Sequence, residues 1–104
     1  MRFLQADVLG AGGYTPWRKI AGLAEAFDAR LAPHGASFPE INSHLVAAFP
    51  HGETVPATTP GQPPEAWARL YTNFAIVDGE VRLSERPGLG LELDEQFLAR
   101  HRLD

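Results

Sequence analysis

The sequence contains no cysteine. This absence excludes disulfide bonds, thiolate nucleophiles and thiolate metal sites, so any bound metal would need histidine or carboxylate ligands. Basic residues are also few, since 9 lysines and arginines stand against 13 aspartates and glutamates and the formal net charge is −4. Because a chain of this charge lacks the positive surface that attracts nucleic acid, we predict no nucleic-acid partner.

Long apolar stretches are missing too. No run approaches the roughly 20 apolar residues that a membrane-spanning helix needs, so we predict no membrane segment. The start, "MRFLQADVLG", is too short and too polar for the apolar core of a secretory signal, which favours a cytoplasmic location. With 104 residues, of which 44% are hydrophobic, the chain has an ordinary globular composition.

The first part of the chain carries a strand signal followed by a helix signal. Residues 3–9 are a short apolar segment, in which Asp7 lies near the exit of a predicted strand before the Gly-rich turn "GAGGYT". Thr15 can cap free amides and Pro16 suits a first helical position, so we predict an amphipathic helix over residues 16–28. The apolar stripe of this helix consists of Ile20, Leu23, Ala24 and Phe27.

A second strand and a second helix come next. The segment "DARLAPHG" predicts a short strand that ends on Pro33, His34 and Gly35, because proline and glycine resist further pairing. The stretch "PEINSHLVAAF" predicts a helix that stops before Pro50. Alternating strands and helices indicate parallel strands with crossover helices, and "ETVPA" is a weak candidate for a third strand.

From residue 50 the pattern changes. The stretch "PHGETVPATTPGQPP" holds five of the nine prolines, and we divide the chain into residues 1–57 and residues 58–104. In the second part, "PEAWARLY" is a candidate short helix, and "FAIVDGEVRL" predicts a β-hairpin that turns at Asp78 and Gly79. The end, "LELDEQFLARHRL", predicts a short strand and a final helix that Asp94 caps.

Two or three parallel strands with two helices would leave apolar surface uncovered. Parallel sheets are normally buried on both faces. We therefore expect that the chain either associates with copies of itself or belongs to a larger barrel.

Several stretches, taken in order, resemble one enzyme family. They are "ADVLGAGGYTPWRKIAGLAEAF", "LAPHG", "SHLVAAFP", "DGEVRL" and "RPGLGLELDEQFL". This set resembles the C-terminal end of the mandelate racemase / muconate lactonizing enzyme family of the enolase superfamily, in its mandelate racemase-like branch. The resemblance implies an α/β fold: a partial TIM barrel of the last three βα units with parallel strands, followed by a β-hairpin and a C-terminal helix of the capping region.

The resemblance also implies a chemistry and two catalytic residues. Members of the family abstract a proton next to a substrate carboxylate and stabilise the enediolate with Mg²⁺. His34 matches the general acid/base at the end of the seventh strand, and Asp7 matches the carboxylate at the end of the sixth strand that hydrogen-bonds to it. Such a carboxylate fixes the imidazole tautomer and raises its basicity. The family's Mg²⁺ ligands come from earlier strands, and their counterparts are not in this chain.

The same residues have plainer interpretations. Asp7 could be a turn or capping residue, as an aspartate before glycines often is. The stretch "GAGG" could form a phosphate cradle, although a tight turn between strand and helix suits it better. His44 and His51 could bind a metal, but Pro50 breaks the helix between them and no carboxylate completes the set, which favours surface or packing roles.

One position departs from the family. Members usually carry a glutamate at the end of the eighth strand that donates a hydrogen bond to the substrate carboxylate, and the spacing places Pro56 there. Proline has no such donor. Glu53 would replace the missing glutamate only if the strand register shifted.

Together these features predict the C-terminal fragment of a Mg²⁺-dependent acid-sugar dehydratase, a hydro-lyase, or of a racemase that acts on a small carboxylate substrate. The resemblance assigns the metal ligands and a second catalytic base of the family to earlier strands that are not in this chain. We therefore expect the isolated chain to be inactive. The alternative is a non-catalytic α/β module that self-associates as a homo-oligomer or docks to a separate N-terminal half. A third interpretation is an independent α/β fold with an unrelated ligand.

Overall fold

The computed structural model describes residues 2–34, 38–55 and 70–103. The chain divides into two compact units, Met1–Ala57 and Thr58–Asp104. Pro56 and most of the predicted short helix over residues 64–71 lie outside the described residues. In the part of the chain that the structure describes, no helix is both long and apolar enough to cross a bilayer.

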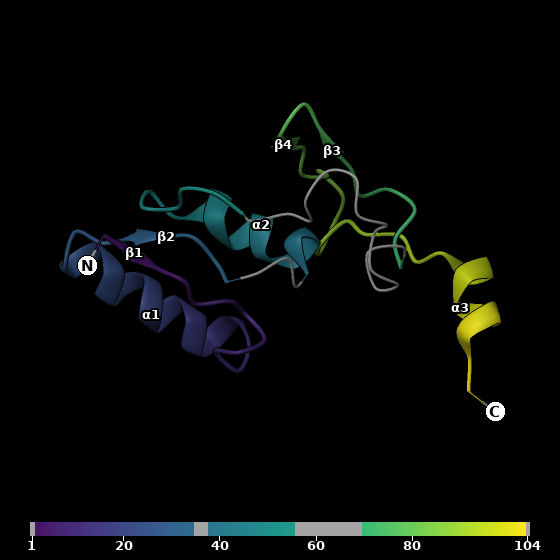
Figure 1. The fold of residues 1–104 in the computed structure, drawn as a ribbon, viewed down its shortest axis with the longest axis horizontal. Coiled ribbons are helices and arrows are strands. Elements are labelled where there is room, and N and C mark those ends of the chain that lie inside the picture. The colour runs from purple at the N-terminus through teal and green to yellow at the C-terminus, as the bar shows by residue number, and fades with distance from the viewer. Residues whose placement is uncertain (1, 35–37, 56–69, 104) are drawn as a thin grey trace. The chain divides into compact units, whose positions relative to one another are not determined.

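The first unit is built from alternating strands and helices (Figure 1). The order is β1 (Phe3–Leu4), α1 (Tyr14–Ala26), β2 (Arg30–Leu31) and α2 (Pro39–Ala48). The two strands run parallel, with Phe3 opposite Arg30 and Leu4 opposite Leu31. A parallel bridge between Leu31 and Gly52 extends this pairing to a third segment. The predicted strand–helix alternation and the parallel pairing are confirmed, and the strands are shorter than the seven residues predicted for the first.

Helix α1 departs in two ways from its prediction. It begins at Tyr14 after Gly13, so Thr15 lies inside the helix and does not cap it. Its buried face consists of Trp17, Ala21 and Ala24, whereas two members of the predicted stripe are exposed, Leu23 by 59% and Phe27 by 80%. The helix therefore presents apolar side chains on two faces.

The core of the first unit collects small and aliphatic side chains around one indole. The ring of Trp17 is fully buried and packs edge-on against Phe49, with 5.3 Å between the ring centroids. Close packing of this kind restricts the side chains to few arrangements. The fully buried members of the cluster are Val8, Trp17, Ala21, Ala24, Ala29, Leu31 and Leu45.

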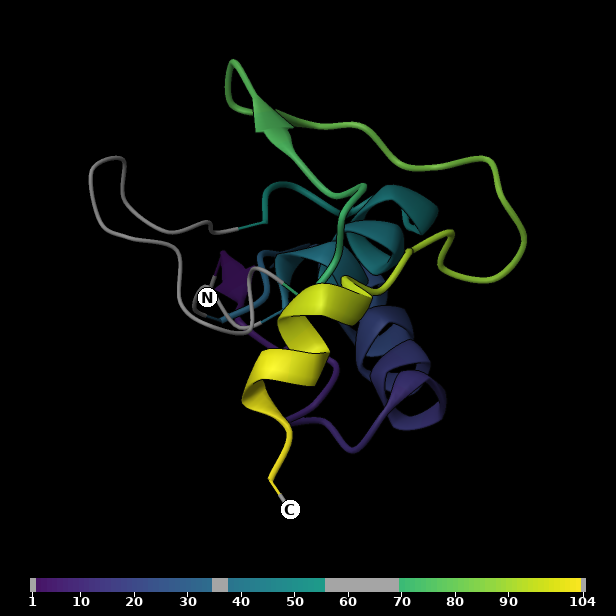
Figure 2. The same ribbon diagram turned by 90° about the vertical axis from the view of Figure 1, so that its right-hand side faces the viewer.

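The second unit contains the predicted hairpin and the final helix. Strand β3 (Ile76–Val77) pairs antiparallel with β4 (Glu80–Val81), and the hairpin prediction is confirmed. Asp78 and Gly79 both have positive φ, which two-residue hairpin turns require. Helix α3 (Glu95–His101) starts as predicted, because the Asp94 carboxylate accepts the Phe97 N–H at 2.8 Å. Within this unit the hairpin and α3 lie at different ends (Figures 1 and 2).

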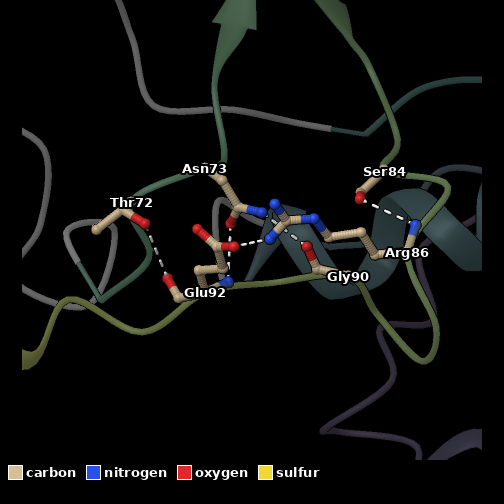
Figure 3. A network of polar contacts seen from close by, with 6 residues as sticks. All are labelled: Thr72, Asn73, Ser84, Arg86, Gly90 and Glu92. Carbon is tan, nitrogen blue, oxygen red and sulfur yellow. Dashed lines mark hydrogen bonds and ion pairs between the residues drawn. The ribbon is translucent and has the colours of Figure 1, made fainter.

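A polar network holds the segment that leads to α3 (Figure 3). The side-chain amide of Asn73 donates to the Gly90 carbonyl at 2.7 Å and accepts the Glu92 N–H at 2.8 Å. Arg86 forms an ion pair with Glu92. In the "GLELDE" stretch, Glu92 therefore serves ion pairing and Asp94 serves helix capping.

Candidate functional site at the ends of β1 and β2

Asp7 follows β1 and is half-buried. Its Oδ1 accepts the Gly10 N–H at 2.7 Å, and its carbonyl accepts the Ala11 N–H at 2.9 Å. Both contacts close the turn that leads into α1. Asp7 therefore serves as a turn residue, as the plainer interpretation of the sequence expected. A second oxygen, Oδ2, has no hydrogen-bond partner among the described residues.

His34 follows β2 and is exposed. Leu4 and Leu31, the last residues of the two strands, are opposite each other. Asp7 lies three residues after Leu4, and His34 lies three residues after Leu31. The two predicted catalytic residues thus lie just beyond the same ends of neighbouring parallel strands. In the part of the chain that the structure describes, no hydrogen bond or ion pair joins their side chains, and the Asp7 carboxylate binds Gly10 instead.

The strand pairing changes just before these two residues. The N–H groups of Arg30 and Ala32 donate to the carbonyls of Arg2 and Leu4, at 2.8 and 3.0 Å. The next donor, His34, reaches the Gln5 carbonyl at 3.2 Å and not that of Ala6, one residue further on. Regular pairing ends here because the chain around Asp7 is held by side chains of the helices.

Two buried side chains hold the backbone on either side of Asp7. The indole N–H of Trp17, from α1, donates to the Ala6 carbonyl at 2.8 Å. Oδ1 of Asn42, from α2, accepts the Val8 N–H at 3.0 Å. Trp17 is fully buried and Asn42 is 1% exposed. The chain from Ala6 to Val8 is therefore fixed from two directions.

Asn42 was not singled out from the sequence, although a signal was present. It lies three residues before Leu45 and seven before Phe49, so it belongs to the apolar stripe of α2. A polar residue in such a stripe must find a partner when it is buried. Here the partner is Val8, 34 residues away.

Glu40, in the first turn of α2, is a second buried polar residue that the sequence did not reveal. It is 1% exposed, and its Oε1 has no hydrogen-bond partner among the described residues. Burial raises the pKa of this carboxyl, and a hydrogen bond from its own backbone N–H opposes the rise. A carboxyl in this setting favours the neutral form more than an exposed glutamate does.

The third segment bears on the missing glutamate of the family pattern. The Leu31 N–H donates to the His51 carbonyl at 2.8 Å, and the Glu53 N–H donates to the Leu31 carbonyl at 3.0 Å. The Glu53 side chain forms an ion pair with Arg30. Leu31 is opposite Gly52, so the residue that corresponds to His34 on the third segment is residue 55, three positions after Gly52. Glu53 therefore lies two positions before the place that corresponds to His34.

The Gly-rich turn and the histidines offer no ligand site among the described residues. The N–H groups of Gly12 and Gly13 donate to the carbonyls of Leu9 and Val8, at 3.0 and 2.7 Å. They are thus committed to the tight turn and do not form a phosphate cradle. No group of three or more histidines and carboxylates is close enough to hold a metal ion within residues 2–34, 38–55 and 70–103.

Parallel strands joined by helices, with an aspartate and a histidine just beyond neighbouring strand ends, define a βα-type scaffold. Comparison with known families agrees, since a family described as enolase C-terminal domain-like matches residues 1–97. The chain belongs to this family. The resemblance to the mandelate racemase / muconate lactonizing enzymes is confirmed.

Curated relatives and solved structures support the same assignment. The chain is 36% identical over 96 residues to a 3,6-anhydro-alpha-L-galactonate cycloisomerase of Streptomyces coelicolor, covering 92% of this chain and 25% of that one. An L-talarate dehydratase structure from a Polaromonas species, complexed with Mg and L-glucarate, has a TM-score of 0.72 and 38% identity. That match covers 93% of this chain and 25% of the dehydratase.

A mandelate racemase/muconate lactonizing enzyme from a marine actinobacterium gives a TM-score of 0.81 at 29% identity, covering 94% of this chain and 28% of that one. The chain thus spans about a quarter of the length of the curated relatives that it matches. Magnesium accompanies several of the solved relatives, and the family implies Mg²⁺ as cofactor. The described residues of this chain do not form a site for it.

Proposed function

We propose that this chain is the C-terminal portion of an acid-sugar dehydratase, a hydro-lyase, or of a racemase, contributing the last three βα units of a barrel. The observation that carries the proposal is the placement of Asp7 and His34 three residues beyond the opposed pair of Leu4 and Leu31. Active sites of such barrels lie at this end of the strands. The second unit would then be the segment that returns to a capping region.

In this proposal His34 exchanges a proton with the carbon next to the substrate carboxylate. Its imidazole is exposed, so a substrate can reach it. Oδ2 of Asp7 accepts the other ring N–H, while Oδ1 stays bound to Gly10. A carboxylate in this position fixes the tautomer and stabilises the imidazolium that forms. Mg²⁺ would stabilise the enediolate, but no step is assigned to it on residues of this chain.

A chimeric enzyme tests the proposal. Residues 1–103 would replace the matching C-terminal quarter of the Polaromonas L-talarate dehydratase. We expect Mg²⁺-dependent dehydration of L-talarate. His34→Asn removes the base and should lower the rate of dehydration by about a hundredfold or more. Pro56→Glu should raise kcat by restoring a hydrogen-bond donor. A folded chimera that binds Mg²⁺ and stays inert with either residue at position 56 would refute the proposal.

The purified chain alone provides the complementary measurement. Without the earlier strands it should show no turnover of acid sugars at any Mg²⁺ concentration. Measurable dehydration by the isolated chain would contradict the assignment of the metal ligands to another part of the protein.

A second candidate function is docking, which a surface groove favours. The groove has a volume of about 440 Å³ and is lined by Leu4, Leu23, Ala24, Phe27 and Ala29. Leu23 and Phe27 are exposed, which is costly for large apolar side chains gathered in one place. β1 pairs only with β2 among the described residues, so its other edge is open to a further strand.

We propose the preceding portion of a barrel as the occupant of this groove, because the relatives are about four times as long as this chain. Light scattering after size-exclusion chromatography would be run on the chain with the separately expressed N-terminal portion of the Polaromonas enzyme. A one-to-one complex is expected, weakened by Phe27→Glu but not by Leu103→Glu, where the leucine is 94% exposed in the second unit. A homodimer, or two separate species, would count against this occupant.

A further inference from the structure

The contacts around Asp7 form a chain that leads to Phe38, at the start of α2. Asn42 accepts the Val8 N–H through Oδ1, and its Nδ2 lies 3.5 Å from the carbonyl of Phe38. Phe38 follows His34 by four residues and precedes α2. One buried amide therefore contacts the residue next to Asp7 and the residue that precedes α2.

Phe38 is a position that needs such support. It has φ of 53°, a left-handed conformation that is unfavourable for a bulky L-residue. It also caps α2 without a side-chain hydrogen bond. Its carbonyl receives the N–H groups of Ile41 and Asn42, at 3.0 and 3.1 Å, and the Asn42 amide adds a further polar contact. The start of α2 is thus secured by contacts that converge on one carbonyl.

We propose that Asn42 is a positioning residue for the Asp7–His34 pair. By holding the Val8 N–H it fixes the turn that presents the Asp7 carboxylate, and through Phe38, four residues after His34, it ties that turn to the start of α2. Trp17 supports the same turn from the other side through the Ala6 carbonyl. This inference rests on the proposed function, because it assigns the geometry of that same pair to a residue that touches neither side chain's reacting atoms.

The first test uses the full chain and needs no activity. The Gly10 N–H donates to Oδ1 of Asp7, so the downfield displacement of its NMR proton shift from the unfolded-chain value reports this hydrogen bond. Asn42→Leu keeps the size of the side chain and removes both polar contacts. We expect the downfield displacement of the Gly10 proton to fall below half its wild-type amplitude.

Ser43→Ala is the matched control. Ser43 is also buried in the first half of α2, but its hydroxyl binds the Pro39 carbonyl within the helix and does not reach β1. It should leave the Gly10 amplitude unchanged. Asn42→Asp keeps an oxygen for the Val8 N–H and should restore most of the amplitude. If Asn42→Leu fails to fold, Asn42→Thr, which is shorter and still polar, carries the same expectation.

Three outcomes would overturn the inference. They are a folded Asn42→Leu or Asn42→Thr chain with full Gly10 amplitude, an equal loss in Ser43→Ala, and a folded Asn42→Asp chain that recovers nothing. Each would show that the response does not depend on the contact with Val8.

The second test uses the chimera. Asn42→Leu should lower kcat about tenfold or more and change KM less than twofold, because misplaced catalytic groups slow the reaction more than they weaken binding. A folded parent chimera that binds Mg²⁺ and stays inert with either residue at position 56 would refute the proposed function and leave the Gly10 result standing. An active chimera that Asn42→Leu does not slow would refute the positioning role alone.

Discussion

Asn42 in the first unit and Asn73 in the second both use a side-chain amide to hold backbone that is distant in sequence. Asn42 is 1% exposed and binds Val8, whereas Asn73 is exposed and binds Gly90 and Glu92. A buried N–H that loses its acceptor cannot form a hydrogen bond with water instead, whereas an exposed N–H can. The same chemistry is therefore expected to matter more at the strand ends of the first unit than in the network of Figure 3.

The largest difference between the units is expected in the stability lost when alanine replaces a glycine that has little space around it. A Cβ at Gly52 would lie 1.9 Å from the Val46 carbonyl oxygen, which is helix backbone that cannot move freely. A Cβ at Gly90 would lie 2.6 Å from the Ser84 Cβ, in a loop, and φ there is +64°. We expect Gly52→Ala to cost about 3 kcal/mol or more and Gly90→Ala about 1–2 kcal/mol.

Hydrogen exchange measured residue by residue would give the free energy of opening for each unit separately. Gly52→Ala should accelerate exchange at Ala32 and Gly13, and Gly90→Ala at Thr72 and Asp94. A Gly52→Ala chain with unchanged protection at Ala32 would show that the third segment does not pack as described.

The two asparagines provide the next test. Asn42→Leu leaves the Val8 N–H buried without an acceptor and should destabilise the first unit by about 2 kcal/mol. Asn73→Leu should cost the second unit no more than about 1 kcal/mol, because water replaces the lost partners. The opening free energies of the Gly13 and Asp94 amides measure the two losses. Equal losses would mean that burial does not separate the two amides.

The periodic parts of this fold could be predicted from the sequence because local chemistry determines them. Asp78 and Gly79 accept the positive φ that the hairpin turn requires, and Asp94 supplies the cap of α3. The ends of parallel strands meet at one edge, so the placement of Asp7 and His34 beyond an opposed pair also follows from the pattern.

The remaining features depend on contacts between distant residues. Helix α1 has apolar side chains on two faces, and the face that carries Trp17 is buried because its indole reaches the Ala6 carbonyl. Nothing in the spacing of Leu23 and Phe27 distinguishes their face from a buried one. The partner of Asn42 lies 34 residues away, so its role required the folded chain.

The smallest expected effect concerns the Glu40 carboxyl, which is buried with one oxygen that has no hydrogen-bond partner among the described residues. Glu40 is buried in the first unit with Oε1 unpaired, whereas Glu92 is exposed in the second and paired with Arg86. Because burial raises the Glu40 pKa above its usual value of 4.5, its charged form destabilises the fold at neutral pH. This penalty is absent below the unfolded-state pKa and develops as the pH rises through the folded-state pKa. Glu40→Gln should therefore stabilise the first unit by about 1 kcal/mol at neutral pH.

The pH dependence separates this effect from a simple change in packing. The advantage of Glu40→Gln should shrink as the pH falls towards 4.5, because the Glu40 carboxyl then becomes neutral in the unfolded chain as well as in the folded one. Glu92→Gln, which removes an exposed ion pair, should change the opening free energy of the second unit by no more than about 0.5 kcal/mol. Both effects are measured as the opening free energies of the two variants at neutral pH and near pH 4.5. A Glu40→Gln chain whose advantage is constant with pH would show that folding does not raise the pKa of this carboxyl.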